Sequence, residues 1–417
     1  MESNKNKSIL QIDPRFCTFC GTCVGICPNN ALVARDGHIL LRGKCDSCGL
    51  CYKFCPGIEI DLPLMSNNLF DDSNPDAYFG HYHSIWVAHS MDSKVRSNAS
   101  SGGVVTSLLV YLLDAGKIDG AIVVGIHPQR AWDYDVKIAR TREEIYEASQ
   151  SKYKQIPLNT ILKKINQLDG KYAIVGLPCH IHGIRKLQIA RSKDACKIHY
   201  CIGLYCGFNM HYQATEDLIN KLGVKKKDII SLQYRGGVHP GGFLLKTQNS
   251  EKLLDKSYYN VYNLLYVPSR CLLCMDLTNE LADISVGDIW LEKYTGGWSS
   301  VIIRSKDGHA IFTEALEKGY LNSDAISRDD LFRSHAHLLK HKKENAAIRL
   351  KYSAIKPDYG LNLAKPNLKQ HATGILSLVF LIALQSRVTR GIVKILPLNA
   401  VRLIANTMNK VIRKGRH

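Results

Sequence analysis

Two cysteine runs near the N-terminus constrain this chain more than any other feature of its sequence. They are Cys17-x-x-Cys20-x-x-Cys23-x-x-x-Cys27-Pro28 and Cys45-x-x-Cys48-x-x-Cys51-x-x-x-Cys55-Pro56. In bacterial ferredoxins this spacing lets three closely spaced thiolates bind one [4Fe–4S] cubane, while the fourth cysteine reaches the other cluster. The sequence therefore predicts two clusters, with the ligand sets Cys17, Cys20, Cys23, Cys55 and Cys45, Cys48, Cys51, Cys27.

Two zinc sites are the alternative for the same cysteines. Zinc is usually bound by paired C-x-x-C units rather than by a four-cysteine run that ends in proline, so the spacing favours clusters. Gly21 and Gly49 would let the backbone turn tightly around each cluster, and Pro28 and Pro56 would stop the chain after the last ligand. Such a pair of clusters carries single electrons but performs no substrate chemistry of its own.

Three properties of the chain limit the environment in which these clusters can act: its length, its N-terminal sequence and its net charge. A chain of 417 residues is long enough for two or three domains. The start, MESNKNKSIL, is polar and basic without a signal peptide, so we expect a reducing, cytoplasmic location in which grouped cysteines serve metal or redox chemistry. A formal net charge of +18 suggests nucleic acid, an anionic membrane or an anionic substrate as partner. We predict no nucleic acid, because the basic residues are not interleaved with aromatic ones.

Alternating patterns after the cysteine runs indicate an α/β core with parallel strands. The strand-like runs are Ile85–His89, Ile118–Gly125, Tyr172–Gly176 and Ile198–Leu204, and the helix-like stretches include Val104–Asp114 and Asn159–Leu168. Between Ser231 and Arg304 the sequence becomes strand-rich and glycine-rich. Residues 308–322 predict a helix that ends at a glycine cap.

We therefore predict the fold class α/β (α+β), in four parts. They are a ferredoxin domain at 1–63, an Asn- and Asp-rich linker at 64–83, a mixed α/β flavin-binding domain at 84–345, and a basic tail at 346–417. The large domain divides into residues 84–170 and 171–345, and its second half is the glycine-rich, strand-rich part.

Six cysteines lie outside the two runs. Cys179 follows Gly176-Leu-Pro, Cys206 follows Gly203-Leu-Tyr, and Cys271 and Cys274 form a C-x-x-C pair. Four thiolates from three segments suggest a third cluster or a zinc site, against the alternative of buried structural cysteines. Cys196 and Cys201 lie in no motif, and we predict no metal role for them.

Two segments are candidates for binding phosphate. The segment Ser100-Ser-Gly-Gly-Val-Val-Thr106 precedes an apolar helix, where Ser100 or Ser101 could cap the N-terminus and the glycines could admit a phosphate; a plain capped helix is the alternative. The strand Tyr172–Gly176 followed by Leu-Pro-Cys is a strand–loop–helix unit, whose loop is a usual cofactor position. Ser151-Lys-Tyr153 offers a cation and an aromatic ring, or only an exposed turn. A G-x-G-x-x-G fingerprint is absent.

Taken together, these motifs resemble a known family. Ser100–Thr106, Ser151–Tyr153, Gly176–Cys179, Gly203–Cys206, the pair Cys271 and Cys274, and Ala282–Asp288 occur in the order found in the β subunit of coenzyme F420-reducing hydrogenase and F420-dependent dehydrogenases. The arrangement with a fused ferredoxin domain is also similar to 7-hydroxymethyl chlorophyll a reductase. The resemblance covers roughly residues 14–320.

The resemblance implies a bound FAD with a [4Fe–4S] cluster beside it. Cys179, Cys206, Cys271 and Cys274 would be the ligands of this third cluster. The residues near FAD would be Ser100, Ser101, Gly102, Gly103, Thr106, Ser151, Lys152, Tyr153, Gly176 and Pro178. It also implies an oxidoreductase that passes electrons from reduced F420 through FAD and the third cluster to the ferredoxin pair and a redox partner, or in reverse.

No side chain is expected to act as a catalytic nucleophile. Arg185, Lys186 and Arg235 are candidates to contact the anionic substrate, against the simpler reading of ordinary surface charges. Two other functions stay open: a polyferredoxin-like electron-carrier subunit without a substrate pocket, and a reductase of another small organic substrate, either chlorophyll-reductase-like or linked to polysaccharide biosynthesis.

The tail has its own pattern. It has no acidic residue after Asp358, and its apolar run Gly374–Leu384 is too short to cross a membrane. Past Pro397 one helical face carries Leu398, Val401, Ile404, Ala405, Met408, Val411 and Ile412, and the other carries Arg402, Asn406, Lys410 and Arg413. A basic amphipathic helix of this kind predicts peripheral contact with the inner face of the membrane through residues 371–417. The alternative is a helix packed on the body of the protein or on a partner subunit.

Overall fold

The cysteine-rich N-terminal region folds around short helices and one hairpin. The structure is a computed structural model that describes residues 7–70, 75–363 and 365–404. The region contains the single turns η1 (Ile9–Gln11) and η2 (Pro14–Phe16), the short helices α1 (Thr22–Gly25) and α2 (Leu50–Lys53), and the antiparallel hairpin β1 (Leu32–Arg35) and β2 (His38–Leu41). Gly21 and Gly49 precede the two helices with φ of 86° and 76°, a left-handed conformation that favours glycine. This is the tight turn that the cysteine motifs predict.

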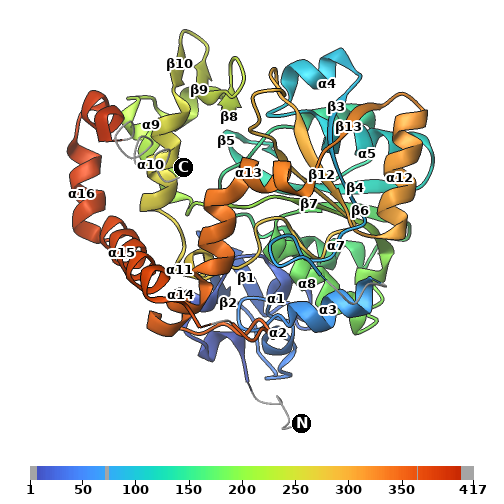
Figure 1. Cartoon of the computed structure of the whole chain (residues 1–417), viewed down its shortest axis with the longest axis horizontal. Coiled ribbons are helices and arrows are strands. Elements are labelled where there is room, and N and C mark those ends of the chain that lie inside the picture. The colour runs from blue at the N-terminus through green and yellow to red at the C-terminus, as the bar shows by residue number, and fades with distance from the viewer. Residues whose placement is uncertain (1–6, 71–74, 364, 405–417) are drawn as a thin grey trace.

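An eight-stranded mixed sheet forms the centre of the molecule (Figure 1). Its order is β13 (Leu321–Ala325), β3 (Ser84–Ser90), β12 (Ser299–Ile303), β11 (Ile284–Asp288), β7 (Ile198–Leu204), β6 (Tyr172–Gly176), β4 (Gly120–His127) and β5 (Arg130–Ala139). Strands β11, β7, β6 and β4 run parallel, whereas the outer pairings are antiparallel. The predicted mixed α/β fold is therefore confirmed, and the predicted parallel arrangement holds for the four central strands.

The four predicted strands and the glycine-ended helix are all present. Strand β4 begins at Gly120, two residues after the predicted start, while β6 and β7 have the predicted bounds. Helix α12 (Lys306–Glu317) ends before Gly319, which has a φ of 74° and terminates the helix as predicted. The prediction carried this helix to residue 322, which is too far because β13 starts at Leu321.

Helices cover both faces of this sheet because its strands alternate their buried side chains. On one face, Val123 and Ala173 pack with the apolar side of α5 (Val104–Asp114) and α12. On the other face, Ile122 and Ile174 pack against α8 (Pro178–Ile189). Smaller helices complete these layers: α3 (Leu62–Leu69), α4 (Ser93–Asn98), α6 (Arg142–Glu147), η3 (Leu158–Ile161), α7 (Leu162–Ile165) and η4 (Ala195–Lys197). Helix α3 falls within the segment where the sequence predicts a linker.

A second, smaller sheet accounts for the strand-rich part of the sequence. It consists of β10 (Glu251–Leu254), β9 (Gly242–Thr247) and β8 (Ile229–Gly236), all antiparallel. It packs with α9 (Gln213–Lys221) and α10 (Lys256–Leu265), and the turn η5 (Lys226–Asp228) precedes it. Helix α11 (Ser269–Leu272) then returns the chain toward the N-terminal region.

The C-terminal segments wrap around the molecule instead of leaving it. After α13 (Arg328–Leu339) come a π-helical turn η6 (Lys340–Glu344) and α14 (Ala346–Tyr352). The chain then pairs with the ferredoxin region, since Ile60 N donates to Asp358 O at 2.8 Å and Asp358 N to Ile58 O at 2.9 Å. Helices α15 (Leu368–Leu384) and α16 (Arg387–Ile395) follow along one edge (Figure 1).

The predicted amphipathic helix beyond Pro397 is described only in part. Residues 398–404 are helical, and Val401 is fully buried beside the small sheet. The predicted positions Ala405, Asn406, Met408, Lys410, Val411, Ile412 and Arg413 lie outside the described residues. Within the described part of the chain, no single helix has the length and apolar character needed to cross a membrane. One bent pair, Gln370–Leu384 with Arg387–Ile395 at 59°, meets that test jointly.

One buried side chain joins the ferredoxin region to the large domain. Asn159 Nδ2 donates to Thr22 Oγ1 and to His180 O, both at 2.8 Å, and Asn159 N donates to Cys20 O at 2.9 Å. The contact is close, because a Cβ on Gly25 would lie 2.1 Å from Asn159 O. The position of the first cysteine run relative to α8 therefore depends on this residue.

We expect Asn159→Ala to lower the free energy of unfolding by about 1–3 kcal/mol, because it leaves two buried acceptors without their donor. Anaerobic denaturant unfolding measures the loss. Asn68→Ala is the matched control, since the exposed Asn68 amide bonds only Leu64 O in its own helix. Equal effects of both substitutions would contradict the importance assigned to Asn159.

Candidate functional site

The cysteines predicted for one ferredoxin cluster line a single hollow at the edge of the molecule. Its walls include Cys27, Cys45, Cys48 and Cys51, so the fourth cysteine of the first run does lie with the second run. Cys45 and Cys48 are exposed. Ile9 N donates to Cys51 Sγ at 3.4 Å and Ala31 N to Cys27 Sγ at 3.3 Å. Hydrogen bonds to sulfur are one of the means by which proteins tune cluster potentials.

The other predicted set, Cys17, Cys20, Cys23 and Cys55, is deeper in the molecule. Burial raises the pKa of the Cys17 thiol to about 12 and that of Cys55 to about 11. Burial also raises the pKa of Cys23, and the neighbouring thiols of Cys20 and Cys55 raise it further. Cys17, Cys23 and Cys55 are therefore close enough to Cys20 to interact with it electrostatically, and as thiolates these three would need a compensating positive charge.

Four more cysteines converge from separate elements. Cys179 lies in the first turn of α8, Cys206 follows β7, and Cys271 and Cys274 lie in and just after α11. Burial raises the pKa of Cys206 to about 12 and of Cys271 to about 11. Burial raises the pKa of Cys179 as well, with the thiols of Cys20, Cys271, Cys206 and Cys274 as the next causes. The fold thus brings together the four cysteines that the resemblance groups.

This third set, which we call the central cysteines (Cys179, Cys206, Cys271 and Cys274), adjoins the first ferredoxin set. The thiol of Cys20 acts on the pKa of Cys179, and the thiol of Cys271 acts on that of Cys17. Among residues 7–70, 75–363 and 365–404, no group of three or more His, Cys, Asp or Glu side chains could hold a single metal ion.

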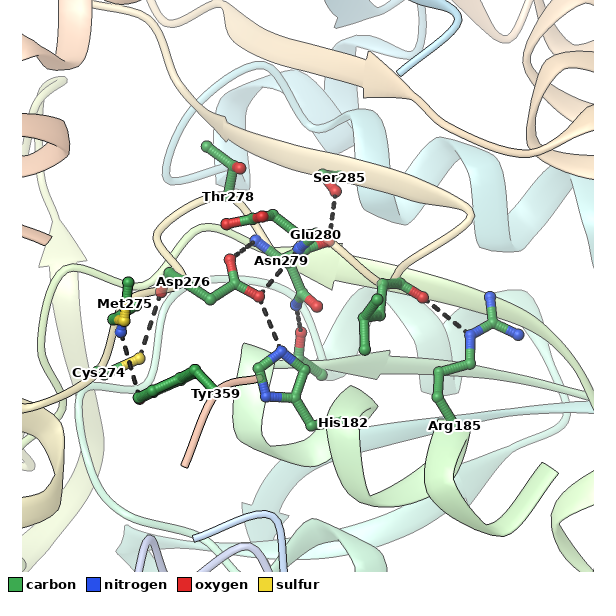
Figure 2. A network of polar contacts seen from close by, with 12 residues as sticks. His182, Arg185, Cys274, Met275, Asp276, Thr278, Asn279, Glu280, Ser285 and Tyr359 are labelled. Atoms are coloured by element: carbon green, nitrogen blue, oxygen red, sulfur yellow. Dashed lines mark hydrogen bonds and ion pairs between the residues drawn. The ribbon is translucent and has the colours of Figure 1, made fainter. Parts of the chain in front are cut away.

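A buried polar network supports the central cysteines (Figure 2). Asp276 Oδ2 accepts from His182 Nε2 at 2.9 Å, and the same carboxylate accepts from Asn279 N and Glu280 N. Burial would raise the pKa of Asp276, but the His182 hydrogen bond and the charges of His182 and Lys343 lower it to about 2. Cys274 Sγ bonds the Asp276 carbonyl at 3.4 Å, so this network fixes the loop that carries the cysteine.

The candidate flavin residues fall into two groups. Ser100 and Ser151 meet, since Ser151 N donates to Ser100 Oγ at 3.0 Å. Arg235 Nη2 donates to Ser100 O at 2.7 Å and its Nη1 lies 3.5 Å from Tyr153 Oη, while Tyr153 stacks on Tyr259 at 5.1 Å. The second group, Gly176 and Pro178, lies at the end of β6 and the start of α8, beside Cys179.

The glycine loop caps its helix differently from the sequence prediction. Gly103, with a φ of 76°, is the N-cap of α5, not Ser100 or Ser101. Ser101 Oγ instead donates to Trp298 O at 2.6 Å, and Gly102 N donates to Ser299 Oγ at 2.9 Å, which ties the loop to β12. Thr106 follows on the buried first turn of α5.

Lys152 turns inward to the carbonyls of Ala148 and Ser149, and burial lowers its pKa to about 7. Close to neutral pH it can therefore hold or release a proton. This inward orientation differs from the exposed charged turn that was the alternative for this segment.

Two of the three basic candidates are not the surface charges that the simpler reading expected. Arg235 is buried and pairs with Asp288 at 2.8 Å, and Arg185 is buried and pairs with Asp283 at 2.8 Å. Lys186 is half-buried and donates to Glu59 O at 3.0 Å. Arg235 alone contacts the candidate flavin residues, so it remains the one basic candidate near that group.

Sequence reasoning missed three buried cations around the C-x-x-C pair: Arg270, Lys342 and Arg349. Arg270 was next to a recognised motif and could have been noticed there. Lys342 and Arg349 lie in a basic stretch of sequence that contains no motif. Such a stretch predicts a solvent-exposed surface. Their burial depends on how η6 and α14 pack, which no local pattern indicates.

Comparison with known proteins decides the family. The models of the N-terminal and C-terminal parts of the coenzyme F420 hydrogenase/dehydrogenase beta subunit match residues 85–163 and 169–329, and a 4Fe-4S binding domain matches residues 10–33. The chain belongs to the coenzyme F420 hydrogenase/dehydrogenase beta subunit family. The predicted resemblance is thereby confirmed, and the family makes the chain an F420-related oxidoreductase with an iron–sulfur domain.

Three similar proteins illustrate the family. Coenzyme F420 hydrogenase subunit beta from Methanothermobacter thermautotrophicus is 33% identical, over 59% of this chain and 86% of its own. Coenzyme F420-dependent sulfite reductase from Methanocaldococcus jannaschii is 28% identical over 76% of this chain, which spans only 48% of that enzyme. A chain of the F420-reducing [NiFe] hydrogenase complex from Methanosarcina barkeri superposes with a TM-score of 0.55 at 25% identity, over 69% of this chain and 99% of that one.

The double substitution Cys271→Ser with Cys274→Ser should remove about four iron and four sulfide per chain while leaving the ferredoxin-type iron in place. Iron and acid-labile sulfide in anaerobically purified protein measure the loss. Cys196→Ser, at an exposed cysteine outside every set, is the control and should change neither. Unaltered iron in the double variant would contradict a cluster at the central cysteines.

Proposed function

We propose that this protein is an FAD- and iron–sulfur-dependent oxidoreductase that exchanges electrons between coenzyme F420 and a one-electron carrier. The observation that carries the proposal is the contiguity of the three cysteine sets. The thiols of Cys20 and Cys179 interact, those of Cys17 and Cys271 interact, and that of Cys51 in the second ferredoxin set acts on Cys23 in the first. Twelve cysteines in one continuous series suit the conduction of single electrons.

Each part of the chain has a distinct task in this proposal. Cys179, Cys206, Cys271 and Cys274 hold a central [4Fe–4S] cluster, and the N-terminal cysteines hold two more. Bound FAD would supply the exchange between the two-electron hydride chemistry of F420 and the one-electron chemistry of clusters. Ser100, Ser151 and Tyr153 would hold the flavin, with Gly176 and Pro178 shaping the loop between it and Cys179. Asp276 and Asn279 keep the loop after Cys274 in position, because Asn279 N and Glu280 N donate to the Asp276 carboxylate and Asn279 Nδ2 donates to Gly176 O.

Electrons would leave or enter at the hollow lined by Cys27, Cys45, Cys48 and Cys51. Cys45 and Cys48 are exposed, so a cluster there is within reach of a docked partner protein. The sequence before Cys45 is exposed and basic, with Arg42 and Lys44, and would attract an acidic redox protein. A partner is in keeping with the relative found in the F420-reducing [NiFe] hydrogenase complex.

Coenzyme F420 is proposed as substrate because the matched family and relatives carry its name. The anionic character of that substrate suits Arg235, whose guanidinium is held beside Ser100 and Tyr153. Asp288 neutralises part of the positive charge of Arg235. We therefore propose that Arg235 both holds the loop at Ser100 and attracts the substrate.

Anaerobic mixing with reduced F420 tests the proposal. In protein loaded with flavin and iron, the flavin absorbance band should bleach first and the cluster bands second. Stopped-flow absorbance measures this order. In the Cys271→Ser, Cys274→Ser variant the flavin should still bleach, while the ferredoxin-type bands should not. Loaded protein that fails to bleach would point to another small organic substrate, and iron and sulfide without flavin would favour the electron-carrier subunit.

The proposal extends to the location of the protein, at the inner face of the membrane. Helix α15 packs Leu378 and Leu381 inward, while Leu376, Val379, Phe380 and Ile382 on its outer side are at least half exposed. On α16, Val388 and Ile395 are exposed beside Arg387 and Lys394. An apolar outer face among basic residues, with no carboxylate after Asp358, suits the surface of an anionic membrane.

Liposome co-sedimentation tests this location. Val379→Glu with Phe380→Glu should weaken binding to vesicles that contain anionic lipid by roughly tenfold or more, because each side chain contributes ~1.5–3 kcal/mol when buried. Val238→Glu, at a position 92% exposed on the β8–β9 loop, is the matched control and should bind like the unaltered chain. Binding that survives deletion of residues 371–417 would overturn the assignment.

A further inference from the structure

Three cations are buried around the pair Cys271 and Cys274. Arg270, Lys342 and Arg349 are only 3%, 1% and 2% exposed. Each comes from a different element: α11, the π-helical turn η6 and α14. A buried charge is costly unless an opposite charge compensates it, so their surroundings must be accounted for.

Their hydrogen bonds go mainly to carbonyl groups. Arg270 Nε donates to Gly57 O at 2.6 Å and its Nη1 to Tyr359 Oη at 2.6 Å. Lys342 Nζ donates to Asp276 O at 2.8 Å. Arg349 donates to the carbonyls of residues 272, 274, 341 and 342.

These bonds engage donors of all three cations but leave the charges uncompensated. Among the residues that the structure describes, none of the three cations forms an ion pair with a carboxylate. The carbonyl that accepts from Lys342 belongs to Asp276, whose carboxylate is engaged instead by His182 Nε2 and by the backbone amides of Asn279 and Glu280.

The remaining neighbours are cysteine sulfurs. The Lys342 ammonium and the Cys274 thiol both donate to the carbonyl oxygen of Asp276, at 2.8 and 3.4 Å, so Nζ and Sγ lie close together. Arg270 directly precedes Cys271 in α11, and Arg349 Nη2 lies 3.5 Å from the backbone carbonyl oxygen of Cys274. All three cations therefore lie beside the C-x-x-C pair.

We infer that Arg270, Lys342 and Arg349 form a cationic cradle that neutralises a cluster at the central cysteines and raises its reduction potential. The inference rests on the proposed function, because it needs an anionic cluster at these cysteines. A cluster with four thiolates is anionic and gains one more negative charge on reduction. Fixed positive charges in a buried site stabilise the reduced form more than the oxidised form.

The cradle also gives the segment after α13 a role. Lys342 and Arg349 lie beyond residue 329, where the match to the family model ends. They are tuning residues, which act on the cluster through charge without binding iron. With the potential raised, the central cluster becomes the better electron acceptor relative to the flavin side.

The test is a potentiometric titration followed by electron paramagnetic resonance. The signal that disappears in the Cys271→Ser, Cys274→Ser variant identifies the central cluster. We expect Lys342→Met to shift that midpoint potential to a more negative value and Lys342→Arg to restore it. The ferredoxin-type signals provide an internal reference that should move much less.

Lys340→Met is the matched control. Lys340 lies in the same π-helical turn but is exposed to solvent, so its removal should leave the central potential nearly unchanged. If Lys342→Met does not fold, Arg349→Gln against Arg349→Lys gives the same comparison of charge.

The outcomes are distinguishable. A loaded central cluster whose potential is unmoved by Lys342→Met and by Arg349→Gln would overturn the cradle alone. A chain that contains no third cluster would overturn the cradle and the proposed function together. Equal shifts with Lys342→Met and Lys342→Arg would indicate a packing effect and would also overturn it.

Discussion

A buried thiolate is stable only beside positive charge, and this constraint governs the middle of the molecule. Burial raises the pKa of Cys17, Cys55, Cys206 and Cys271 well above that of a free thiol. As bare thiols these side chains are inert, and as cluster ligands they require iron and a compensating environment. The ferredoxin region, the end of β6 and α11 meet at these buried cysteines.

The large sheet and the ferredoxin region act as one scaffold for this meeting point. The parallel strands β6 and β7 end near Cys179 and Cys206, which is the edge where α/β sheets commonly bind ligands. Asn159 holds the first cysteine run against α8 through two hydrogen bonds. The C-terminal segment closes the arrangement from the other side, with Asp358 paired to the backbone at Ile58 and Ile60. The relative positions of the cysteine sets are therefore held by contacts between these segments.

Charge is distributed unevenly around this scaffold, and the distribution has consequences. Arg235 and Arg185 are buried with carboxylate partners, so a neighbouring aspartate compensates most of the charge of each. Arg270, Lys342 and Arg349 are buried without such partners in the described part of the chain, and they lie beside the pair Cys271 and Cys274. Exposed basic residues lie beside the cysteine hollow and on α16, and others, such as Lys225 and Lys227, lie elsewhere on the surface. The net charge of +18 thus serves several sites and does not indicate a single polyanionic partner.

The sequence by itself determined the features that depend on neighbours along the chain. Local chemistry accounts for the ferredoxin spacing, the glycine turns before α1 and α2, the strands β6 and β7, and the glycine that ends α12. The family motifs could also be identified in order from the sequence. Only the tertiary structure decided which distant residues meet. It brought Cys179, Cys206 and Cys271 together, moved the α5 cap to Gly103, and buried Lys342 and Arg349 beside Cys274. A local pattern carries hydrophobic periodicity and turn preference, whereas the compensation of a buried charge depends on packing between segments far apart in sequence.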